Sequence, residues 1–533
     1  MHPVFIRIAR GHSAITLKRL LSRKHGMPPN FPGIPEIRNK AVRFSAFVSV
    51  SASLKNPENI ILHTWRCLIN TQLQKFAAEA DKHKKEAMER GISHMTLPGD
   101  ILDTAKISPA ALNVIKTLNK AGYQAYLVGG GVRDLLLDKV PKDFDVVTNA
   151  RPETVKRLCK RSIIIGRRFQ LVHVRENNSL IEVATFRKGQ DHEDSDHVEM
   201  IRKDNTFSSS ITDDAARRDF SINGFYYSPA DNLIHDFLGG VSDLLNSSID
   251  IVGDPDVRFG EDPVRMIRAY RFAAKLGFSI TPRTRNAILK NMASISQVNN
   301  SRMYEEFNKM FLTGHGETSF QVLMRDSVMQ YLLTDMGPLI KSRQFFDFVS
   351  CCLNNTDARH AEGKHNMPHF LYAVMLWPLT KKLFMKMGTV SKYSHIRDTE
   401  RMAMAGNIVL KRQSEITKIP EFVAKDITDI WEMQLTLTNS EVMKDPDMVS
   451  SIIWKEIFRA GLEFLMNRAR LDRSLENCVT FWTDAYTANI PQSLRTRKAL
   501  ISSNKMAAGK KGSEGSRRKG ASGSRGRPAG NIH

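Results

Sequence analysis

The chain has 533 residues, 41% of them hydrophobic and 25% charged, which is the ordinary composition of a globular protein with two or more domains. Its 78 lysines and arginines against 56 acidic residues give a formal net charge of +22, which favours a polyanionic partner, nucleic acid before a membrane surface. The longest strongly apolar run, Phe370–Leu379, is too short to span a bilayer, and the five cysteines have neither CxxC nor zinc-ligand spacing. These patterns exclude a transmembrane protein and a disulfide framework, and the thiols are typical of a reducing compartment.

The first 57 residues are typical of an organellar transit segment. Met1–Pro35 contains six lysines and arginines but no aspartate or glutamate, and apolar and hydroxyl residues lie between the cations. Cationic amphipathic segments of this kind are removed after import into a mitochondrion or a chloroplast. The alternative is a disordered basic N-terminus of a cytoplasmic or nuclear protein. Residues 1–57 are therefore left out of the fold prediction.

Residues 58–106 form a predicted helical lead-in, with a charged helix in Ile60–Arg90 that Gly91 ends. A second amphipathic helix follows Ile107 and ends at Gly122. Short apolar strands then alternate with turns, and a hairpin turn is expected at Glu176–Ser179. The expected strands read QAYLV, DFDVV, IIIG, FQLVHV and LIEVATF. Residues 107–250 therefore predict one domain with a mixed sheet.

Helical patterns dominate from Glu261 almost to the end, so the predicted fold class is α+β, a mixed-sheet domain followed by an all-α part. We divide the all-α part into residues 251–312, a helical body over 313–503 and a tail over 504–533. The tail is rich in glycine and serine and has eight lysines and arginines against Glu514, a composition that predicts disorder. The polar stretch Lys188–Ala216 is long for a loop inside a compact domain, which indicates a functional or mobile segment.

Two aspartates, Asp143 and Asp145, are expected on one face of the second strand, because alternate residues of a strand point the same way. Converging carboxylates attract a hard, oxygen-binding cation, most often Mg²⁺. A DxD pair alone is weak evidence, since it also occurs in calcium loops and glycosyltransferases. Here a third acid, Glu182, interrupts an apolar strand, and we interpret it as aimed at the same cation. The alternative for Glu182 is the solvent face of an edge strand.

A glycine run, Gly129, Gly130 and Gly131, precedes these aspartates and would let backbone N–H groups approach phosphate oxygens. The run matches neither a P-loop nor a dinucleotide-binding fingerprint. Arg133 follows in the first helical turn, where its guanidinium could meet a phosphate. The alternative is a surface arginine paired with Asp134.

Arg217, Arg218 and Asp219, followed by Asn223, bring two cations, one anion and an amide together. Two arginines suit a triphosphate, and an aspartate can accept a hydrogen bond from a ribose hydroxyl. The alternative is a solvated charge cluster at the start of a strand.

The segment Glu261–Arg265 is expected to open a helix, with Asp262 as N-cap and Pro263 as its first residue. Capping leaves Arg265 and Arg268 unexplained, three residues apart on one face of that helix. An aspartate and an arginine one turn apart can read a base edge, and this pattern fits both adenine and cytosine. It therefore does not separate ATP from CTP. His360, His365 and His369 lack metal-ligand spacing and are interpreted as surface residues.

Taken in order, these segments resemble the class II nucleotidyltransferases, which comprise bacterial-type poly(A) polymerases and tRNA CCA-adding enzymes. The resemblance runs from about Gln124 to Phe311 and rests on LVGGGVRDLLL, DFDV, IEVATFR, RRDFSINGFYY, HDFLGGVSDL, EDPVRMIRAYRFAAKLGF and SRMYEEFNKMF. It implies a palm domain over 107–250, a base-reading neck over 251–312, and an RNA-binding body. It also implies two Mg²⁺ ions on Asp143 and Asp145, with Mn²⁺ as an alternative. The acid that completes the metal site is left open between Glu182 and Asp219.

Within this family, Ile164–Val174 (IIGRRFQLVHV) and the C-terminal body resemble the poly(A) polymerases more than the CCA-adding enzymes. We expect an enzyme that adds AMP from ATP to RNA 3′ ends in an organelle, with no membrane involvement. The alternatives are a CCA-adding enzyme that uses CTP and ATP, and an inactive RNA-binding scaffold on the same fold.

Overall fold

The computed structural model describes residues 72–166, 170–177, 179–188 and 207–489. The transit-like segment, the basic tail and the acidic part of the long polar loop lie outside the described residues. The described residues belong to one compact unit, which begins at Gln72. Among these residues, no helix is both long and apolar enough to cross a bilayer.

An eight-stranded mixed sheet forms the first half of the described chain, as predicted. Its strand order is β1-β8-β7-β2-β3-β6-β5-β4, and only the β3–β6 pair is parallel. The strands are β1 (Met95–Pro98), β2 (Ala125–Val128), β3 (Asp145–Thr148), β4 (Ser162–Ile165), β5 (Leu171–Glu176), β6 (Ser179–Thr185), β7 (Phe225–Ser228) and β8 (Leu233–Asp236).

Strands β5 and β6 form the predicted hairpin, in which Glu176 lies opposite Ser179 and Asn177 has a φ of 45°. Because β6 also pairs with β3, it is an interior strand, so the edge-strand part of the alternative for Glu182 is wrong. The side chain is nevertheless half exposed, and its carboxylate lies 3.3 Å from Nε2 of His173. The parallel register places Glu182 directly beside Asp145.

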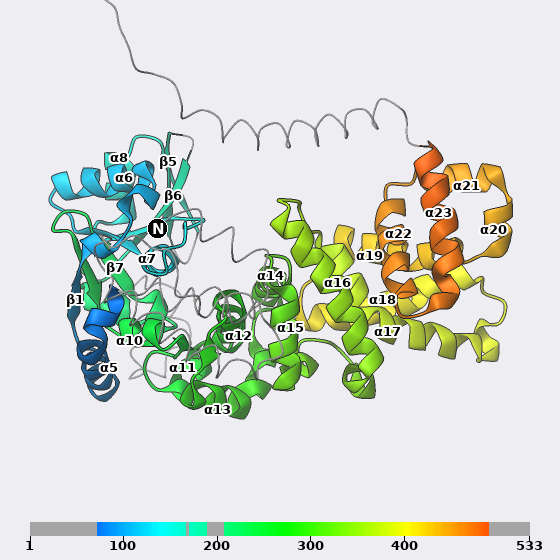
Figure 1. Cartoon of the computed structure of the whole chain (residues 1–533), viewed down its shortest axis with the longest axis horizontal. Helices are drawn as coiled ribbons and strands as arrows, with labels where there is room; N and C mark the ends of the chain where they lie inside the picture. Colours follow the sequence, from blue (N-terminus) through cyan, green and yellow to red (C-terminus); the bar gives the residue numbers. More distant parts are fainter. Residues whose placement is uncertain (1–71, 167–169, 178, 189–206, 490–533) are drawn as a thin grey trace, which may run out of the picture. The chain divides into compact units, whose positions relative to one another are not determined.

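Short helices surround the sheet (Figure 1). The helices α6 (Pro109–Lys120) and α8 (Pro152–Leu158) pack together and against its strands. The helix α7 (Gly130–Leu136) contacts β2 and β7, and α5 (Ala77–Arg90) contacts α10 (Gly240–Leu245). Helix α5 ends at Gly91, whose φ is 79°, and Gly122 with a φ of 85° follows α6, which confirms both predicted stops.

The second half is helical, as predicted. The helices are α9 (Ile211–Ala216), α11 (Pro255–Glu261), α12 (Val264–Leu276), α13 (Pro282–Asn291), α14 (Asn300–Phe311), α15 (Gly316–Arg325), α16 (Arg343–Ala361), α17 (Pro368–Gly388), α18 (Asp398–Ile416), α19 (Glu421–Leu437), α20 (Ser440–Lys444), α21 (Pro446–Ile453), α22 (Phe458–Ala469) and α23 (Glu476–Asn489). A 3₁₀ turn, η5 (Ser221–Asn223), precedes β7, and a two-stranded parallel pair, β9 (Ser248–Ile249) and β10 (Ser279–Ile280), stands before α11 and after α12 in the chain.

One hydrophobic core connects the sheet domain with the helices that follow it. The largest cluster of buried apolar residues begins at Leu73, includes the sheet residues Leu127 and Val146, and continues through Tyr270 to Phe464. A separate cluster around Trp482 holds α19 and α21–α23 together, and the Trp482 indole donates to the Leu437 carbonyl at 2.8 Å. One hydrophobic core therefore crosses the predicted boundaries at residues 250 and 312, and these boundaries separate segments of different expected function.

Candidate active site

The DxD aspartates lie at the start of β3, at the edge of the sheet domain. The strand begins at Asp145, so Asp143 precedes it instead of lying within it, which corrects the prediction that both belong to the strand. Both residues are exposed, whereas Val146 and Val147 behind them are completely buried. The buried valines fix the strand, and the two carboxylates are left available to a ligand.

The electrostatics around Asp145 favour a bound cation. Partial desolvation and the charges of Glu182 and Asp143 raise the pKa of Asp145 to about 6, against the opposing effect of Arg218. Like charges held this close destabilise each other until a cation or a proton neutralises them. Asp143, Asp145 and Glu182 are thus suited to a divalent cation in their chemistry. Among the described residues, no group of three or more His, Cys, Asp or Glu side chains is placed so that it could hold a metal ion.

The glycine run forms the turn into α7. Gly129 has a φ of 73° and is the N-cap of that helix, a backbone conformation that favours glycine. A Cβ at Gly129 would lie 3.7 Å from Nη1 of Arg218, and a Cβ at Gly131 would lie 3.4 Å from the Asp143 carbonyl oxygen. The glycines therefore let α7 lie close to both Asp143 and Arg218.

Arg133 has a different place from either predicted one. Its side chain is only 2% exposed, which corrects the surface alternative. Its Nε and Nη2 donate to Asp134 at 2.9 and 2.6 Å, and its Nη1 donates to Asn223 at 2.6 Å. Because its three nitrogens are all bound within the protein, Arg133 supports Asn223 instead of presenting a guanidinium to a phosphate.

Arg217 and Arg218 share one buried acid, Asp214, which the sequence analysis missed. Arg217 Nε and Arg218 Nη2 each donate to Asp214 at 2.8 Å, and the Tyr226 hydroxyl donates to it at the same distance. Burial alone would raise the pKa of Asp214, but the two arginines lower it. Its position three and four residues before the arginines, in DDAARRD, was a signal that could have revealed this pairing.

Asp219 connects the sheet domain to α12. Both of its bonds with Arg268 end on Oδ2, at 2.8 Å from Nε and 2.6 Å from Nη2. The Asn223 amide and the Phe220 N–H also donate to Asp219. Although burial opposes this, the charge of Arg268 and these hydrogen bonds lower the pKa of Asp219 to about 2. Asp219 is therefore ionised and held in an ion pair with Arg268.

The predicted base-reading pair, Asp262 and Arg265, has other partners in the structure. Asp262 is not the N-cap of α12; it ends α11, and Pro263 precedes the first residue of α12. Its carboxylate accepts from Arg302 at 2.8 and 3.1 Å. Arg265 donates to Glu261 at 2.7 Å and to the Arg258 carbonyl at 2.8 Å.

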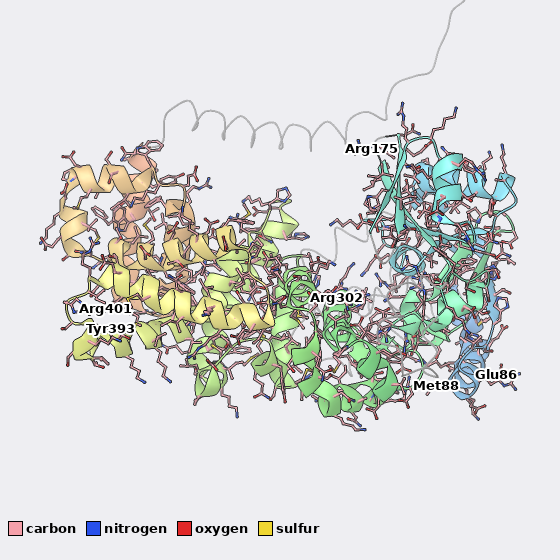
Figure 2. The ribbon with its side chains drawn as sticks, turned by 180° about the vertical axis from the view of Figure 1, so that it is seen from behind. Glu86, Met88, Arg175, Arg302, Tyr393 and Arg401 are labelled. Carbon is pink, nitrogen blue, oxygen red and sulfur yellow. The ribbon has the colours of Figure 1, made fainter. Side chains whose placement is uncertain are left out.

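Residues of both charged motifs, Arg217–Asp219 and Asp262–Arg268, nevertheless line one pocket of about 270 Å³. It is lined by Arg217, Arg218, Asp219, Asp262, Arg265, Arg268, Arg302, Glu305 and Glu306. The last three come from α14, whose residue Arg302 is marked in Figure 2, and were not predicted as site residues. Their segment, SRMYEEFNKMF, was among the motifs that carry the family resemblance, and Glu306 lies among the buried Met303, Phe307 and Met310 of an amphipathic helix. Both were signals that could have revealed them. Five arginines against four acids suit an anionic ligand.

A second pocket, of about 390 Å³, is lined by Gln330, Tyr331, Leu333, Asp335, Met336 and Gly337 and shares no residue with these motifs. His369 lies in α17, its side chain is only 17% exposed, and it pairs with Asp426 at 3.1 Å, which corrects its interpretation as a surface residue.

Comparisons with known proteins agree with this arrangement. Three family models match: the poly A polymerase head domain over residues 125–250, the probable RNA and SrmB-binding site of polymerase A over 277–340, and the polymerase A arginine-rich C-terminus over 394–521. Poly(A) polymerase I of Salmonella typhimurium is 35% identical over 447 residues, which are 79% of this chain and 93% of that protein. Poly(A) polymerase I of Escherichia coli O157:H7 is 38% identical over 397 residues, which are 70% and 82%. A CCA-adding enzyme of Lactobacillus helveticus is 40% identical over 217 residues, which are 40% and 52%.

Solved structures show the same fold. The Bacillus stearothermophilus CCA-adding enzyme in complex with CTP has a TM-score of 0.51 and 23% identity, over 72% of this chain and 83% of that one. A CCA-adding enzyme in complex with ATP has a TM-score of 0.52 and 19% identity, over 73% and 86%. The chain thus belongs to the family of the bacterial poly(A) polymerases and CCA-adding enzymes, and it is a template-independent nucleotidyltransferase of RNA 3′ ends.

Proposed function

We propose that this nucleotidyltransferase is a poly(A) polymerase, which adds AMP from ATP to RNA 3′ ends. The observation that carries the proposal is how far the likeness extends. The poly(A) polymerase relatives match over 447 and 397 residues and a polymerase A model covers 394–521, whereas the Lactobacillus helveticus CCA-adding enzyme matches over 217 residues. The helical body, where this chain follows the polymerases, is the part that must tell one RNA from another.

For the metal, we propose that Asp143 and Asp145 hold two Mg²⁺ ions, for which Mn²⁺ could substitute, and that Glu182 is the third acid. Glu182 lies beside Asp145 in the sheet, while Asp219 is bound by Arg268. Bound ions of this kind polarise the α-phosphate and neutralise the charge that develops on the pyrophosphate. The protein's part is to fix the carboxylates on a buried strand and to keep Asp145 ready to lose its proton near neutral pH.

For the nucleotide, we propose that the pocket between the RRD segment and α12–α14 receives ATP. Arg217 and Arg218 would attract its phosphates, with Gly129 and Gly130 leaving room for a close approach. Arg268 would hold Asp219 at the wall of the pocket, because its three nitrogens are bound to Asp219 and Glu306. Arg133 and Asn223 would support Asp219 from behind, because Arg133 donates to Asn223, which donates to Asp219. Asp262, Arg265 and Arg302 would contact the base.

The experiment that tests the substrate is incorporation of each of the four nucleoside triphosphates by purified protein. Two acceptors are compared, a single-stranded RNA and a tRNA that lacks its 3′-terminal CCA. We expect long A tails on both acceptors from ATP alone. Addition of C, C and A restricted to the tRNA would establish the CCA-adding alternative. This alternative is tested because a CCA-adding enzyme in complex with CTP has the same fold.

The experiment that tests the metal assignment is the variant Asp145→Ala. We expect it to abolish incorporation while leaving RNA binding in a filter assay unchanged, since the body would still hold the RNA. The matched control is Asp138→Ala, an exposed aspartate that follows α7. Unchanged activity of Asp145→Ala would refute the assignment, and an inactive wild type that still binds RNA would support the scaffold alternative.

We also propose import into a mitochondrion or chloroplast, on the basis of the acid-free, arginine-containing Met1–Pro35 alone. A reporter fused to Met1–Val50 tests this, and diffuse cytoplasmic or nuclear fluorescence would overturn it.

A further inference from the structure

Three guanidinium groups surround one aromatic ring behind the proposed nucleotide pocket. The ring belongs to Phe272 of α12, which is 7% exposed. The Cζ atoms of Arg271, Arg268 and Arg133 lie 4.3, 5.4 and 5.5 Å from its centroid. Arg133 comes from α7 of the sheet domain, whereas the other two precede Phe272 on its own helix.

Each of these arginines is also held by an acid. Arg133 donates to Asp134, Arg268 to Asp219, and Arg271 to Glu306 at 2.8 Å. The acids lie on three different elements, namely α7, the RRD segment and α14. The Phe272 ring is thus in the middle of the charged contacts that connect the sheet domain to α12 and α14.

The ring also meets the RRD segment directly. Phe220, the residue after Asp219, packs edge-on against Phe272 with 5.7 Å between their centroids. The position of Asp219 is consequently fixed by its neighbour Phe220 and by its ion-pair partner Arg268. Both of these residues contact the Phe272 ring.

Three like charges around one point repel each other, and an aliphatic side chain there would only fill space. The face of an aromatic ring carries partial negative charge and attracts guanidinium groups over a range of about 6 Å. The aromatic character of residue 272 therefore reduces the cost of gathering these arginines, which a side chain such as leucine could not do.

We propose that Phe272 is a positioning residue for the nucleoside triphosphate. Its ring holds Arg268 at the wall of the pocket and keeps Arg133 behind Asn223, so that the RRD segment and α12 keep one arrangement before the nucleotide enters. This inference rests on the proposed nucleotide pocket and adds to it a residue that does not line that pocket.

The test changes the charge distribution of the Phe272 ring while keeping the shape of the ring. Site-specific incorporation of mono-, di- and trifluorophenylalanine at position 272 weakens the negative face stepwise. KM for ATP, kcat and the unfolding temperature are measured for each variant and for Phe272→Leu. The same fluorinated residues and leucine at Phe320 are the matched control, because Phe320 is a buried ring that packs against the rings of Phe345 and Phe346.

We expect KM for ATP to rise with each fluorine, to about tenfold for the trifluoro and leucine variants, since that is the range of one to two cation–π contacts. The value of kcat should stay within about twofold. Leucine at position 320 should lower the unfolding temperature without raising KM. A KM that does not respond to fluorination at position 272, or that responds equally at position 320, would overturn the proposal.

The fluorinated series keeps the test decisive if Phe272→Leu fails to fold, because those rings have nearly the native size. If the wild type adds C, C and A instead of poly(A), the proposed function fails but the comparison is run unchanged with CTP. A flat fluorine series in an active enzyme would instead refute the positioning role alone.

Discussion

At the scale of single residues, aspartates of this protein divide into those that hold the structure together and those offered to a ligand. Asp250 is 3% exposed and accepts from Lys84 at 2.9 Å and from Thr281 and Thr284 at 2.7 Å each. Burial opposes its ionisation, but Lys84 and these hydrogen bonds lower its pKa to about 2. At Asp145 the charge of Arg218 does not outweigh desolvation and the charges of Glu182 and Asp143, and its pKa is raised to about 6. Asp250 is thus kept ionised by partners within the protein, whereas Asp145 is left to a bound cation or a proton.

This difference predicts that the protein loses stability at acid pH when the Asp250 carboxylate is protonated. Its pKa is lower in the folded protein than the ordinary 3.8, so the stabilisation is present above about pH 4 and is lost as the pH falls towards 2. A shift of this size corresponds to roughly 2 kcal/mol of unfolding free energy. We expect Asp250→Asn to be less stable than wild type by about that amount at pH 7 in urea unfolding, with the gap narrowing between pH 4 and pH 2. A gap that is the same at all these pH values would mean that the carboxylate charge contributes nothing.

At the scale of elements, α14 completes a pocket whose other residues the sequence motifs already contained. The motifs indicated the glycine turn at the start of α7, because turn residues act on their near neighbours. They did not show that Asp143 precedes β3 or that Asp262 ends α11 instead of capping α12. They did not predict that Asp262 would pair with Arg302, forty residues further on, or that Arg133 would be buried. Such pairings depend on how α12 and α14 pack, and helix periodicity specifies only which face of each helix is apolar.

The contact between Asp262 and Arg302 predicts a variant with an effect on binding and little effect on stability. The Arg302 side chain is 56% exposed, so the ion pair should contribute less than about 1 kcal/mol to unfolding. Arg302→Ala removes a cation from the pocket and releases Asp262, and we expect KM for ATP to rise about fivefold. The control is Lys309→Ala, which removes a similarly exposed cation of α14 that pairs with Glu305 and Glu306 but does not line the pocket. Equal KM values for the two variants would show that the general charge of α14 matters and that the position of Arg302 does not.

At the scale of the whole molecule, the fold class could be predicted from the sequence, whereas the extent of the hydrophobic core could not. The short apolar strands between Gln124 and Phe186 and the helical patterns from Glu261 onward predicted the α+β class, which the structure confirms. Separate domains were expected, yet Leu127 of the sheet and Phe464 of α22 belong to one buried cluster. Local periodicity cannot show which apolar faces meet, and the β9–β10 pair that joins Ser248 to Ser279 is too short to give a strand pattern.

The charge of the whole molecule predicts how RNA binding responds to salt. With a net charge of +22, we expect the logarithm of RNA affinity to fall linearly with the logarithm of salt concentration, with a slope of about −0.7 for each phosphate contacted on a single strand. Residues 504–533 contain eight lysines and arginines and one glutamate, so their removal should make the slope shallower by several of these increments. Nucleotide incorporation into a saturating concentration of RNA should not change, because no residue of the pocket is removed. Affinity is measured by fluorescence anisotropy between 50 and 300 mM KCl, and a variant of equal length with the tail cations changed to glutamine separates charge from length. An unchanged slope in both would place the RNA contacts on the helical body alone.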